Sequence, residues 1–535
     1  MSVTNDIDTP TQNSTDISQS GSYRVHSSED LQKSLADLHR PVFIIRENNN
    51  QISVKNDAAR EDQLVASAPA LPISRLGNHS FQATHGCRAA FYAGSMANGI
   101  SSPEMVIALS NSGLLGSYGS GGVPLDEMES SIQKIQSALP EKPYAVNLLN
   151  SPFEPDRERQ TVDLLLKHNI RTLEASAFLS MTRGLVLYRA AGLRLLSDGS
   201  FDIQNRIIAK ISRKEIAQRF MRPAPKDILQ SLVSEGRITQ QQANLAAKMP
   251  VADDITVEAD SGGHTDNRPL LCLIPTMLAE RNAVQKEQNY PNTIRIGAAG
   301  GISTPESALA ALMAGAAYIV TGSINQSCVE SAASAHTRDL LAKADMADVI
   351  MAPAADMFEM GVKVQVLKRG TMFAMRASKL YDTYRDYESV EAIPEKTRKQ
   401  IEEQILQKSM DDVWRDTVTF FEKRDPVQIQ KAQTNPKHKM ALIFRWYLGL
   451  SSRWSSRGEP GREMDYQIWC GPSMGTFNDW VRGTYLEEKE NRHVADINLH
   501  ILTGAAYLYR IRILEAQGVV FPEDVRTYLP QAPLI

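Results

Sequence analysis

The 535-residue chain contains only four cysteines, and no two of them have the spacing of a CxxC motif or of another metal site. We therefore expect reduced thiols rather than a disulfide framework. Long apolar runs are absent as well: no stretch approaches the length of a membrane span, and the polar N-terminus has no signal-peptide core. These absences predict a cytoplasmic protein without membrane association.

The chain also lacks an excess of positive charge, since 58 Lys and Arg stand against 62 Asp and Glu, for a formal net charge of −4. That balance gives no electrostatic reason to expect nucleic-acid binding.

P-loop, HExxH and GxSxG motifs are missing, no metal site is expected, and residues 297–301 do not fit GxGxxG. A nicotinamide-binding Rossmann domain is therefore not indicated. What the chain does have is 42% hydrophobic residues, enough for one large barrel with additions or for several domains.

The clearest strand–helix–strand pattern lies in residues 294–325. Its first strand closes on Gly297, a helix capped by Ser303 or Thr304 follows, and a second strand covers residues 317–320. This is the pattern of a βαβ unit in a parallel sheet, so both strands are expected to end at the same edge.

Glycine turns follow both of these strands, as Gly300-Gly301 and Gly322-Ser323. Without Cβ atoms, backbone N–H groups can approach an anion closely, and the N-terminus of the helix adds positive potential. In (β/α)8 barrels this edge is where phosphate groups bind. One glycine pair could be only a tight turn, but the second turn favours a phosphate site.

Strand–helix repeats extend over residues 71–338 and predict an α/β fold, a TIM (β/α)8 barrel, with a doubly wound sheet as second choice. Within this region residues 221–247 are expected to form one helix. Residues 1–22 are predicted to be disordered, and residues 23–70 to form a small N-terminal α/β appendage with a hairpin. Residues 339–535 lack strand alternation and predict a large, mostly helical C-terminal part.

Three polar side chains stand out on the predicted strands. His264 follows a strand end through Ser261-Gly262-Gly263, and its imidazole could donate a proton near neutral pH or hold a substrate carbonyl. Lys210 interrupts an apolar strand; it either pairs with an interior acid such as Glu174 or lies as a cation beside an electron-rich cofactor ring. Asn147 could bind the edge of a heterocycle or satisfy interior backbone groups.

These residues carry a resemblance to a known family. Five motifs occur in the order seen in the nitropropane dioxygenase-like flavoproteins: Gly94-Ser95-Met96-Ala97, Val146-Asn147, Ser261-Gly262-Gly263-His264, Ala298–Ile302 and Thr321-Gly322-Ser323. That family includes nitronate monooxygenases and FMN-dependent bacterial enoyl-acyl-carrier-protein reductases. Residues 208–213, 258–266 and 321–326, together with the C-terminal part, look like its PfaD-type branch. The members of that branch are the separate enoyl reductase subunits of polyunsaturated fatty acid and polyketide synthases.

The resemblance implies an FMN-dependent enoyl reductase in fatty acid or polyketide biosynthesis. NADPH or NADH would reduce the flavin, and hydride would pass to a trans-2-enoyl thioester on an acyl carrier protein, with His264 as the catalytic residue. The phosphate of FMN would be held by Gly300, Gly301, Gly322 and Ser323. The other cofactor-binding residues would be Gly94, Ser95, Met96, Asn147, Lys210, Ser261, Gly262 and Gly263.

Two rival functions stay open. A nitronate monooxygenase would use the same fold and FMN with O2, although Lys210 departs from that pattern and favours a reductase. A non-catalytic scaffold protein of a synthase would need neither Gly300-Gly301 nor His264. The helical residues 339–535 are expected to cover the site, and a homodimer is possible.

Overall fold

The computed structural model describes residues 23–26, 29–48, 51–57, 59–150 and 155–535. The predicted disorder of residues 1–22 lies outside this range. The chain divides into two compact units, one of residues 1–72 with 506–528 and one of residues 73–505 with 529–535. No helix in the described part of the chain is long and apolar enough to cross a membrane.

The smaller unit confirms the predicted hairpin, because β2 and β3 pair antiparallel and β4 joins the other edge of β2. The sequence analysis did not predict that residues near the C-terminus belong to this unit. Arg510 is buried there and donates to the carbonyls of Leu35 and Asp37. The elements of this unit are β1 (Tyr23–Arg24), α1 (Glu29–Ala36), β2 (Val42–Arg46), β3 (Ile52–Lys55), β4 (Leu64–Ala68), the end of α19 (Val494–Glu515) and β17 (Val519–Val520). The predicted domain boundaries at residues 70 and 338 stay predictions.

The larger unit contains a closed barrel of eight parallel strands, in the order β11-β12-β13-β14-β5-β6-β7-β8. The TIM barrel prediction is therefore confirmed, and the doubly wound sheet is wrong because the first and last barrel strands pair, β14 with β5. The strands are β5 (Phe91–Ala93), β6 (Leu115–Tyr118), β7 (Ala145–Leu149), β8 (Thr172–Ser176), β11 (Arg206–Ile211), β12 (Asp254–Glu258), β13 (Arg295–Ala299) and β14 (Ile319–Thr321).

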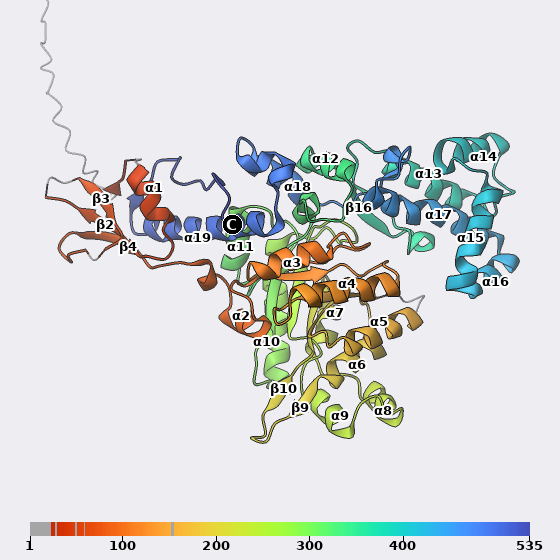
Figure 1. Cartoon of the computed structure of the whole chain (residues 1–535), viewed down its shortest axis with the longest axis horizontal. Coiled ribbons are helices and arrows are strands. Elements are labelled where there is room, and N and C mark those ends of the chain that lie inside the picture. Colours follow the sequence, from red (N-terminus) through yellow and green to blue (C-terminus); the bar gives the residue numbers. More distant parts are fainter. Residues whose placement is uncertain (1–22, 27–28, 49–50, 58, 151–154) are drawn as a thin grey trace, which may run out of the picture. The chain divides into compact units, whose positions relative to one another are not determined.

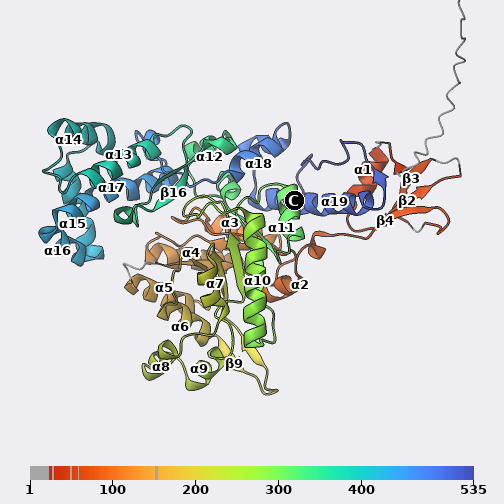
Figure 2. The ribbon, with the colours of Figure 1, turned by 180° about the vertical axis from the view of Figure 1, so that it is seen from behind.

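Helices surround this barrel, and α7 and α10 lie side by side on it (Figures 1 and 2). The single helix predicted for residues 221–247 is wrong: α7 ends at Met221, and a turn at Gly236, with φ of +71°, separates α8 from α9. The helices are α2 (His79–His85), α3 (Pro103–Asn111), α4 (Leu125–Ala138), α5 (Pro155–Lys167), α6 (Arg183–Ala191), α7 (Lys214–Met221), α8 (Lys226–Ser234), α9 (Gln240–Ala246), α10 (Leu270–Gln288) and α11 (Pro305–Met313). A short hairpin, β9 (Leu193–Leu195) and β10 (Phe201–Ile203), follows α6.

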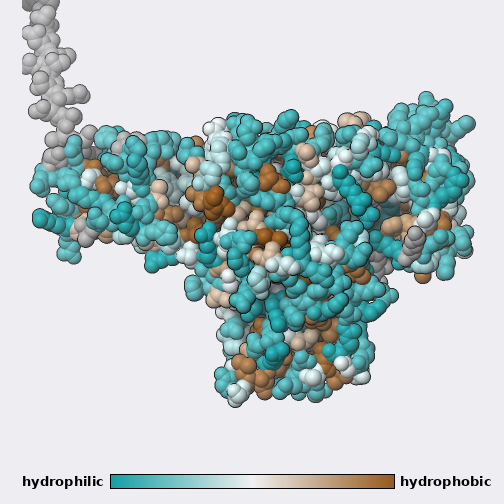
Figure 3. All heavy atoms as spheres, viewed as in Figure 1, coloured by the Kyte–Doolittle hydropathy of each residue, from teal (hydrophilic) through white to brown (hydrophobic). Residues whose placement is uncertain are grey.

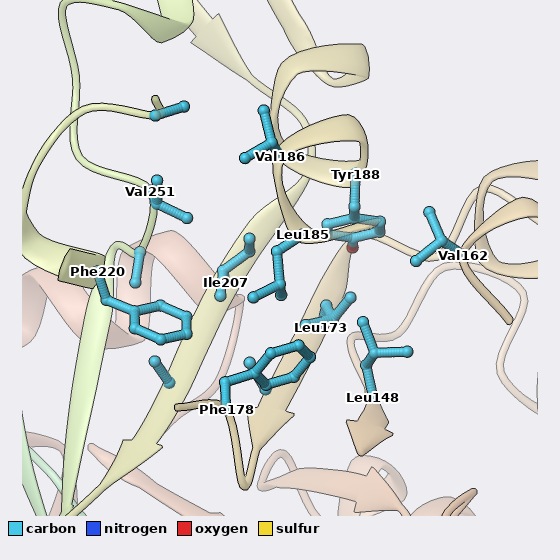
Figure 4. Packing of buried hydrophobic residues seen from close by; sticks show 14 of the residues in the cluster. Leu148, Val162, Leu173, Phe178, Leu185, Val186, Tyr188, Ile207, Phe220 and Val251 are labelled. Carbon is cyan, nitrogen blue, oxygen red and sulfur yellow. The ribbon is translucent and has the colours of Figure 1, made fainter. Parts of the chain in front are cut away.

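The main core lies between the strands and these helices. Leu148, Leu173 and Ile207 point from three strands towards helix residues such as Leu185 and Phe220 (Figure 4). Because side chains alternate along a strand, the residues between them face the barrel interior. Most residues on the face seen in Figure 3 are hydrophilic, as expected when the apolar side chains fill the cores.

Gly297 does not end its strand, as the sequence suggested, but lies in the middle of β13. A Cβ atom there would come within 2.1 Å of the Tyr318 ring. Inside the barrel the Tyr318 hydroxyl lies 2.8 Å from Thr256 Oγ1, which in turn lies 3.1 Å from the Tyr92 hydroxyl. Gly297 thus leaves the space that this tyrosine requires.

We expect Gly297→Ala to destabilise the protein by about 1–3 kcal/mol, because the buried ring must move against a packed interior. Denaturant unfolding of the variant measures this loss. Gly449→Ala is the matched control, since Gly449 lies inside the helix Pro436–Arg457 and nothing lies within 4 Å of the new Cβ. Equal stability of Gly297→Ala and the wild type would contradict the conclusion that the Tyr318 ring needs the space at Gly297.

The C-terminal part is mostly helical, as predicted, but it contains an antiparallel hairpin that the sequence analysis missed, β15 (Val349–Pro353) with β16 (Lys363–Leu367). The alternation of apolar and polar residues in β16 was the available signal. Trp446, Trp454 and Trp469 pack against the core of this part, in keeping with a structural role. Its helices are α12 (Ala335–Ala342), α13 (Phe373–Asp386), α14 (Glu395–Ile401), α15 (Met410–Arg424), α16 (Pro426–Thr434), α17 (Pro436–Arg457), α18 (Ser473–Val481) and the start of α19.

Candidate functional site

A cleft opens at the carboxyl ends of the barrel strands, where TIM barrels place their active sites. It encloses about 400 Å³, including the part open to solvent. Its lining comes from the ends of five strands and from one residue of the C-terminal part. The lining residues are Gly94, Ser95, Lys210, Glu258, Ser261, Ala299, Gly300, Gly301, Ile302, Val320, Thr321, Gly322, Ser323 and Ser473.

The two glycine turns form one wall of this cleft. Gly300 has a φ of +85°, and a Cβ there would lie 2.7 Å from the carbonyl carbon of Ala259, so the turn requires glycine. At Gly301 and Gly322 an added Cβ would meet nothing within 4 Å. Thr304 caps α11 through the Ser307 amide, as the sequence predicted. In both turns the backbone therefore borders the cleft without a side chain in between.

Ser261 provides an independent sign of a ligand site. Its hydroxyl is buried at the cleft and has no hydrogen-bond partner, whereas its backbone carbonyl accepts from Gln365 Nε2 at 2.9 Å. A buried hydroxyl without a partner costs free energy, so such groups are normally satisfied by a ligand or water. The bare glycine wall and this hydroxyl fit a phosphorylated, hydrogen-bonding cofactor such as FMN.

Lys210 lies at the floor of the cleft between two carboxylates. Its Nζ is 3.1 Å from Glu258 Oε1 and 3.6 Å from Glu174 Oε1. Burial alone would lower the pKa of Lys210, but the charges of Glu258 and Glu174 outweigh it and raise that pKa. Glu174 is fully buried and also accepts from the Ser95 amide at 3.0 Å. The predicted pairing of Lys210 with Glu174 is therefore observed, whereas its place beside a cofactor ring stays a prediction.

His264 lies beyond this lining and contacts the C-terminal part. Its Nε2 is 3.1 Å from Asp356 Oδ2 on the loop that follows β15, and its side chain is 37% exposed. Burial would lower the pKa of His264, but the hydrogen bond and charge of Asp356, with a smaller contribution from Glu258, raise it. The sequence singled out the histidine but gave no sign of its carboxylate partner, which lies 92 residues further on.

The loop before His264 is clamped by the C-terminal part. Gly263 and Gln365 exchange backbone hydrogen bonds of 2.9 and 2.7 Å, so β16 extends over the loop. A Cβ on Gly262 would lie 2.8 Å from the Cys470 nitrogen, and the Gly471 amide donates to Ser323 Oγ at 3.0 Å. These glycines therefore permit close contact with the segment that covers the site.

The predicted site residues divide into two groups. Those that line the cleft are Gly94, Ser95, Lys210, Ser261, Gly300, Gly301, Gly322 and Ser323. Those outside its lining are Met96, Asn147, Gly262, Gly263 and His264. Asn147 is buried and donates to the Glu174 carbonyl at 3.1 Å and to Ser176 Oγ at 2.9 Å, which matches its structural interpretation. The lining residues that sequence reasoning missed are Glu258, Ala299, Ile302, Val320, Thr321 and Ser473.

Comparison with known proteins gives two matching family models. Residues 88–400 match the nitronate monooxygenase family. Residues 387–466 match the inserted helical domain of [acyl-carrier-protein] S-malonyltransferase.

Curated relatives belong to biosynthetic complexes. One of the polyunsaturated fatty acid synthase subunits of Thraustochytrium sp. is 46% identical over 91% of this chain and 33% of its own length. Polyketide biosynthesis protein PksE of Bacillus subtilis is 44% identical over 88% of this chain and 61% of its own. The chain thus spans about a third of the first relative's length and less than two thirds of the second's.

Among solved structures, the enoyl reductase domain of MlnA, from the macrolactin biosynthesis cluster of Bacillus amyloliquefaciens, is 40% identical with a TM-score of 0.79. The match covers 83% of this chain and 99% of that domain. The chain therefore belongs to the nitronate monooxygenase family, in the branch that contains this enoyl reductase domain and the fatty acid and polyketide synthase proteins.

Proposed function

We propose that the protein is an FMN-dependent enoyl reductase that uses NADPH or NADH to reduce trans-2-enoyl thioesters on acyl carrier proteins. The observation that carries the proposal is the buried, unpartnered hydroxyl of Ser261 in a cleft walled by bare glycine turns. The names of the relatives supply the substrate class, since they include an enoyl reductase domain and proteins of fatty acid and polyketide synthesis.

When bound, FMN supplies the hydride that this reduction needs. The backbone at Gly300, Gly301 and Gly322, with the hydroxyl of Ser323, would hold its phosphate. Ser261 would donate or accept a hydrogen bond at the same ligand. Lys210 would place a fixed cation in the cleft between two carboxylates, so that the three groups together carry a net negative charge.

His264 would complete the reaction as an acid. Asp356 engages Nε2 and favours the imidazolium form, so Nδ1 stays available to protonate the substrate α-carbon or to polarise the thioester carbonyl. The backbone hydrogen bonds between Gly263 and Gln365 would fix the main chain next to His264 and so restrict the position of its imidazole ring.

Anaerobic spectroscopy tests the proposal. The purified protein should bind FMN, NADPH or NADH should bleach its visible absorbance, and an enoyl thioester should restore it. A protein that cannot be reconstituted with FMN would refute the flavin assignment.

A nitronate monooxygenase is the second candidate, because residues 88–400 match that family model. Oxygen uptake with an alkyl nitronate, compared with NADPH consumption with an enoyl thioester, separates the two activities. We expect the second to dominate.

Gly322→Val should abolish tight FMN binding without unfolding the protein. A Cβ on Gly322 would meet nothing within 4 Å, so valine would project only into the cleft. We expect FMN affinity to fall by about tenfold or more, as for the loss of 1.4 kcal/mol. Fluorescence titration of the apoprotein measures it, and an unchanged dissociation constant would remove this turn from the cofactor site.

A further inference from the structure

Residues 470–473, which lead into α18, lie directly against the loops that line the cleft. The Gly471 amide donates to Ser323 Oγ at 3.0 Å. A Cβ on Gly471 would come within 2.9 Å of the Gly262 nitrogen and within 3.0 Å of the Ser261 carbonyl carbon. Because Gly471 has no side chain, this segment of the C-terminal part approaches two barrel loops at once.

Helix α18 begins at Ser473, and Ser473 is one of the residues that line the cleft. Its N-cap residue, Pro472, makes no side-chain cap hydrogen bond, and the first turn of the helix contains no acidic residue. The amides at the start of a helix carry a partial positive charge that favours an anion. Since Ser473 is two residues from Gly471, at most about 7 Å along the chain, this helix start lies near the turn that contains Ser323.

The polar groups of Ser473 have no partners of their own. The residue is only 9% exposed, and neither its hydroxyl nor its backbone amide has a hydrogen bond to any residue in the described part of the chain. By contrast, the next two amides, those of Met474 and Gly475, donate to backbone carbonyls. A buried donor without an acceptor costs free energy, which a ligand in the cleft would recover.

Two more hydroxyls of the lining also lack an acceptor. Ser323 Oγ accepts from the Gly471 amide, so its own O–H is left to donate, and no described residue accepts it. The buried Ser261 hydroxyl has no partner either. Glu258, the carboxylate among the described lining residues, is paired with Lys210. Several donors without an acceptor suit a ligand group with several acceptor oxygens, and phosphate is such a group.

We propose that the amide and hydroxyl of Ser473, at the start of α18, bind the phosphate of FMN together with the glycine turns and the Ser323 hydroxyl. The choice of FMN rests on the proposed function. The C-terminal part then completes the cofactor site instead of only covering it. The diphosphate of NADPH or NADH has the same chemistry and is the other source of such an anion.

Fluorescence titration of the full-length apoprotein with FMN and with riboflavin tests this site, because the two ligands differ only in the phosphate. The wild type should bind FMN more tightly than riboflavin. Ser473→Ala should reduce that preference by about tenfold or more, as for the loss of a hydrogen bond to a charged group, and leave riboflavin binding unchanged. The matched control is Thr476→Ala, in the same helix but outside the lining, which should keep the full preference.

Ser473→Asp separates phosphate binding from a structural role of this residue. A carboxylate at the start of a helix is stabilising, so the melting temperature of the apoprotein should be equal to that of the wild type or higher. The affinity for FMN should nevertheless fall by at least as much as in Ser473→Ala, because the carboxylate repels the phosphate. A preference for FMN that stays intact in both variants overturns the proposal.

The remaining outcomes separate the alternatives. If Ser473→Ala keeps the preference for FMN but binds NADPH about tenfold more weakly, the helix start serves the coenzyme and the assignment to FMN is wrong. A wild type that binds riboflavin as tightly as FMN refutes the phosphate site alone, whereas one that binds neither refutes the proposed function with it. A protein whose preference for FMN depends on Ser473 but that reduces no enoyl thioester would refute the reductase and leave this site standing.

Discussion

Replacing Lys210 by methionine is expected to lower the free energy of unfolding by about 3–5 kcal/mol at neutral pH. The loss arises because Glu174 is fully buried and would keep its charge without the ammonium 3.6 Å away. Glu258 is 24% exposed and is partly solvated, so it contributes less. Denaturant unfolding at pH 7 measures the effect.

Two variants serve as controls for that result. Lys210→Met combined with Glu174→Gln should recover most of the stability, because the uncompensated charge is gone. Lys134→Met removes an exposed partner of Glu104 and should cost at most about 1 kcal/mol. A Lys210→Met protein as stable as Lys134→Met would show that the buried pair of Lys210 and Glu174 does not stabilise the fold.

Sequence reasoning reached the local features of this site and missed its long-range ones. The glycine turns at Gly300 and Gly322 and the Thr304 cap are encoded by neighbouring residues, and so were predictable, although the strand before the first turn continues past Gly297. Glu258 was within reach too, since Thr256 and Glu258 share the inward face of β12 by strand alternation. Asp356 was not, because nothing in its neighbourhood marks it as the partner of a histidine in another part of the chain.

The same limit explains the other differences. Residues 506–528 belong with the N-terminal unit because Arg510 donates to backbone carbonyls there, a contact that no local pattern encodes. The break between α8 and α9 did have a local signal: Gly236 with positive φ and the capping box that Thr239 forms with Gln242.

His264→Ala is expected to reduce kcat for an enoyl thioester by about 10²–10⁴-fold, the usual contribution of a general acid. Flavin reduction by NADPH, measured in the stopped flow without thioester, should be much less affected, because that step requires no proton for the α-carbon. If the reoxidation of reduced flavin by the thioester is equally fast in His264→Ala, the residue is not the acid.

Asp356→Asn should shift the pH profile rather than abolish the reaction. In the proposed mechanism the active form carries a proton on His264, so the rate should fall as the pH rises through the pKa of that histidine, which Asp356 holds above its ordinary 6.5. Replacing the carboxylate by an amide removes the negative charge beside His264. The fall in rate should therefore occur at a lower pH, while the activity at low pH is largely retained. The same sign applies to stability: the ion pair stabilises the fold below pH 6.5, and its contribution is lost as the pH rises through the raised pKa.

NMR titration of His264 in the wild type and in Asp356→Asn measures this shift without turnover. Glu258 also raises the pKa of His264, so some elevation should persist in the variant. A His264 titration that is the same in both proteins would mean that Asp356 does not set the proton affinity of this histidine.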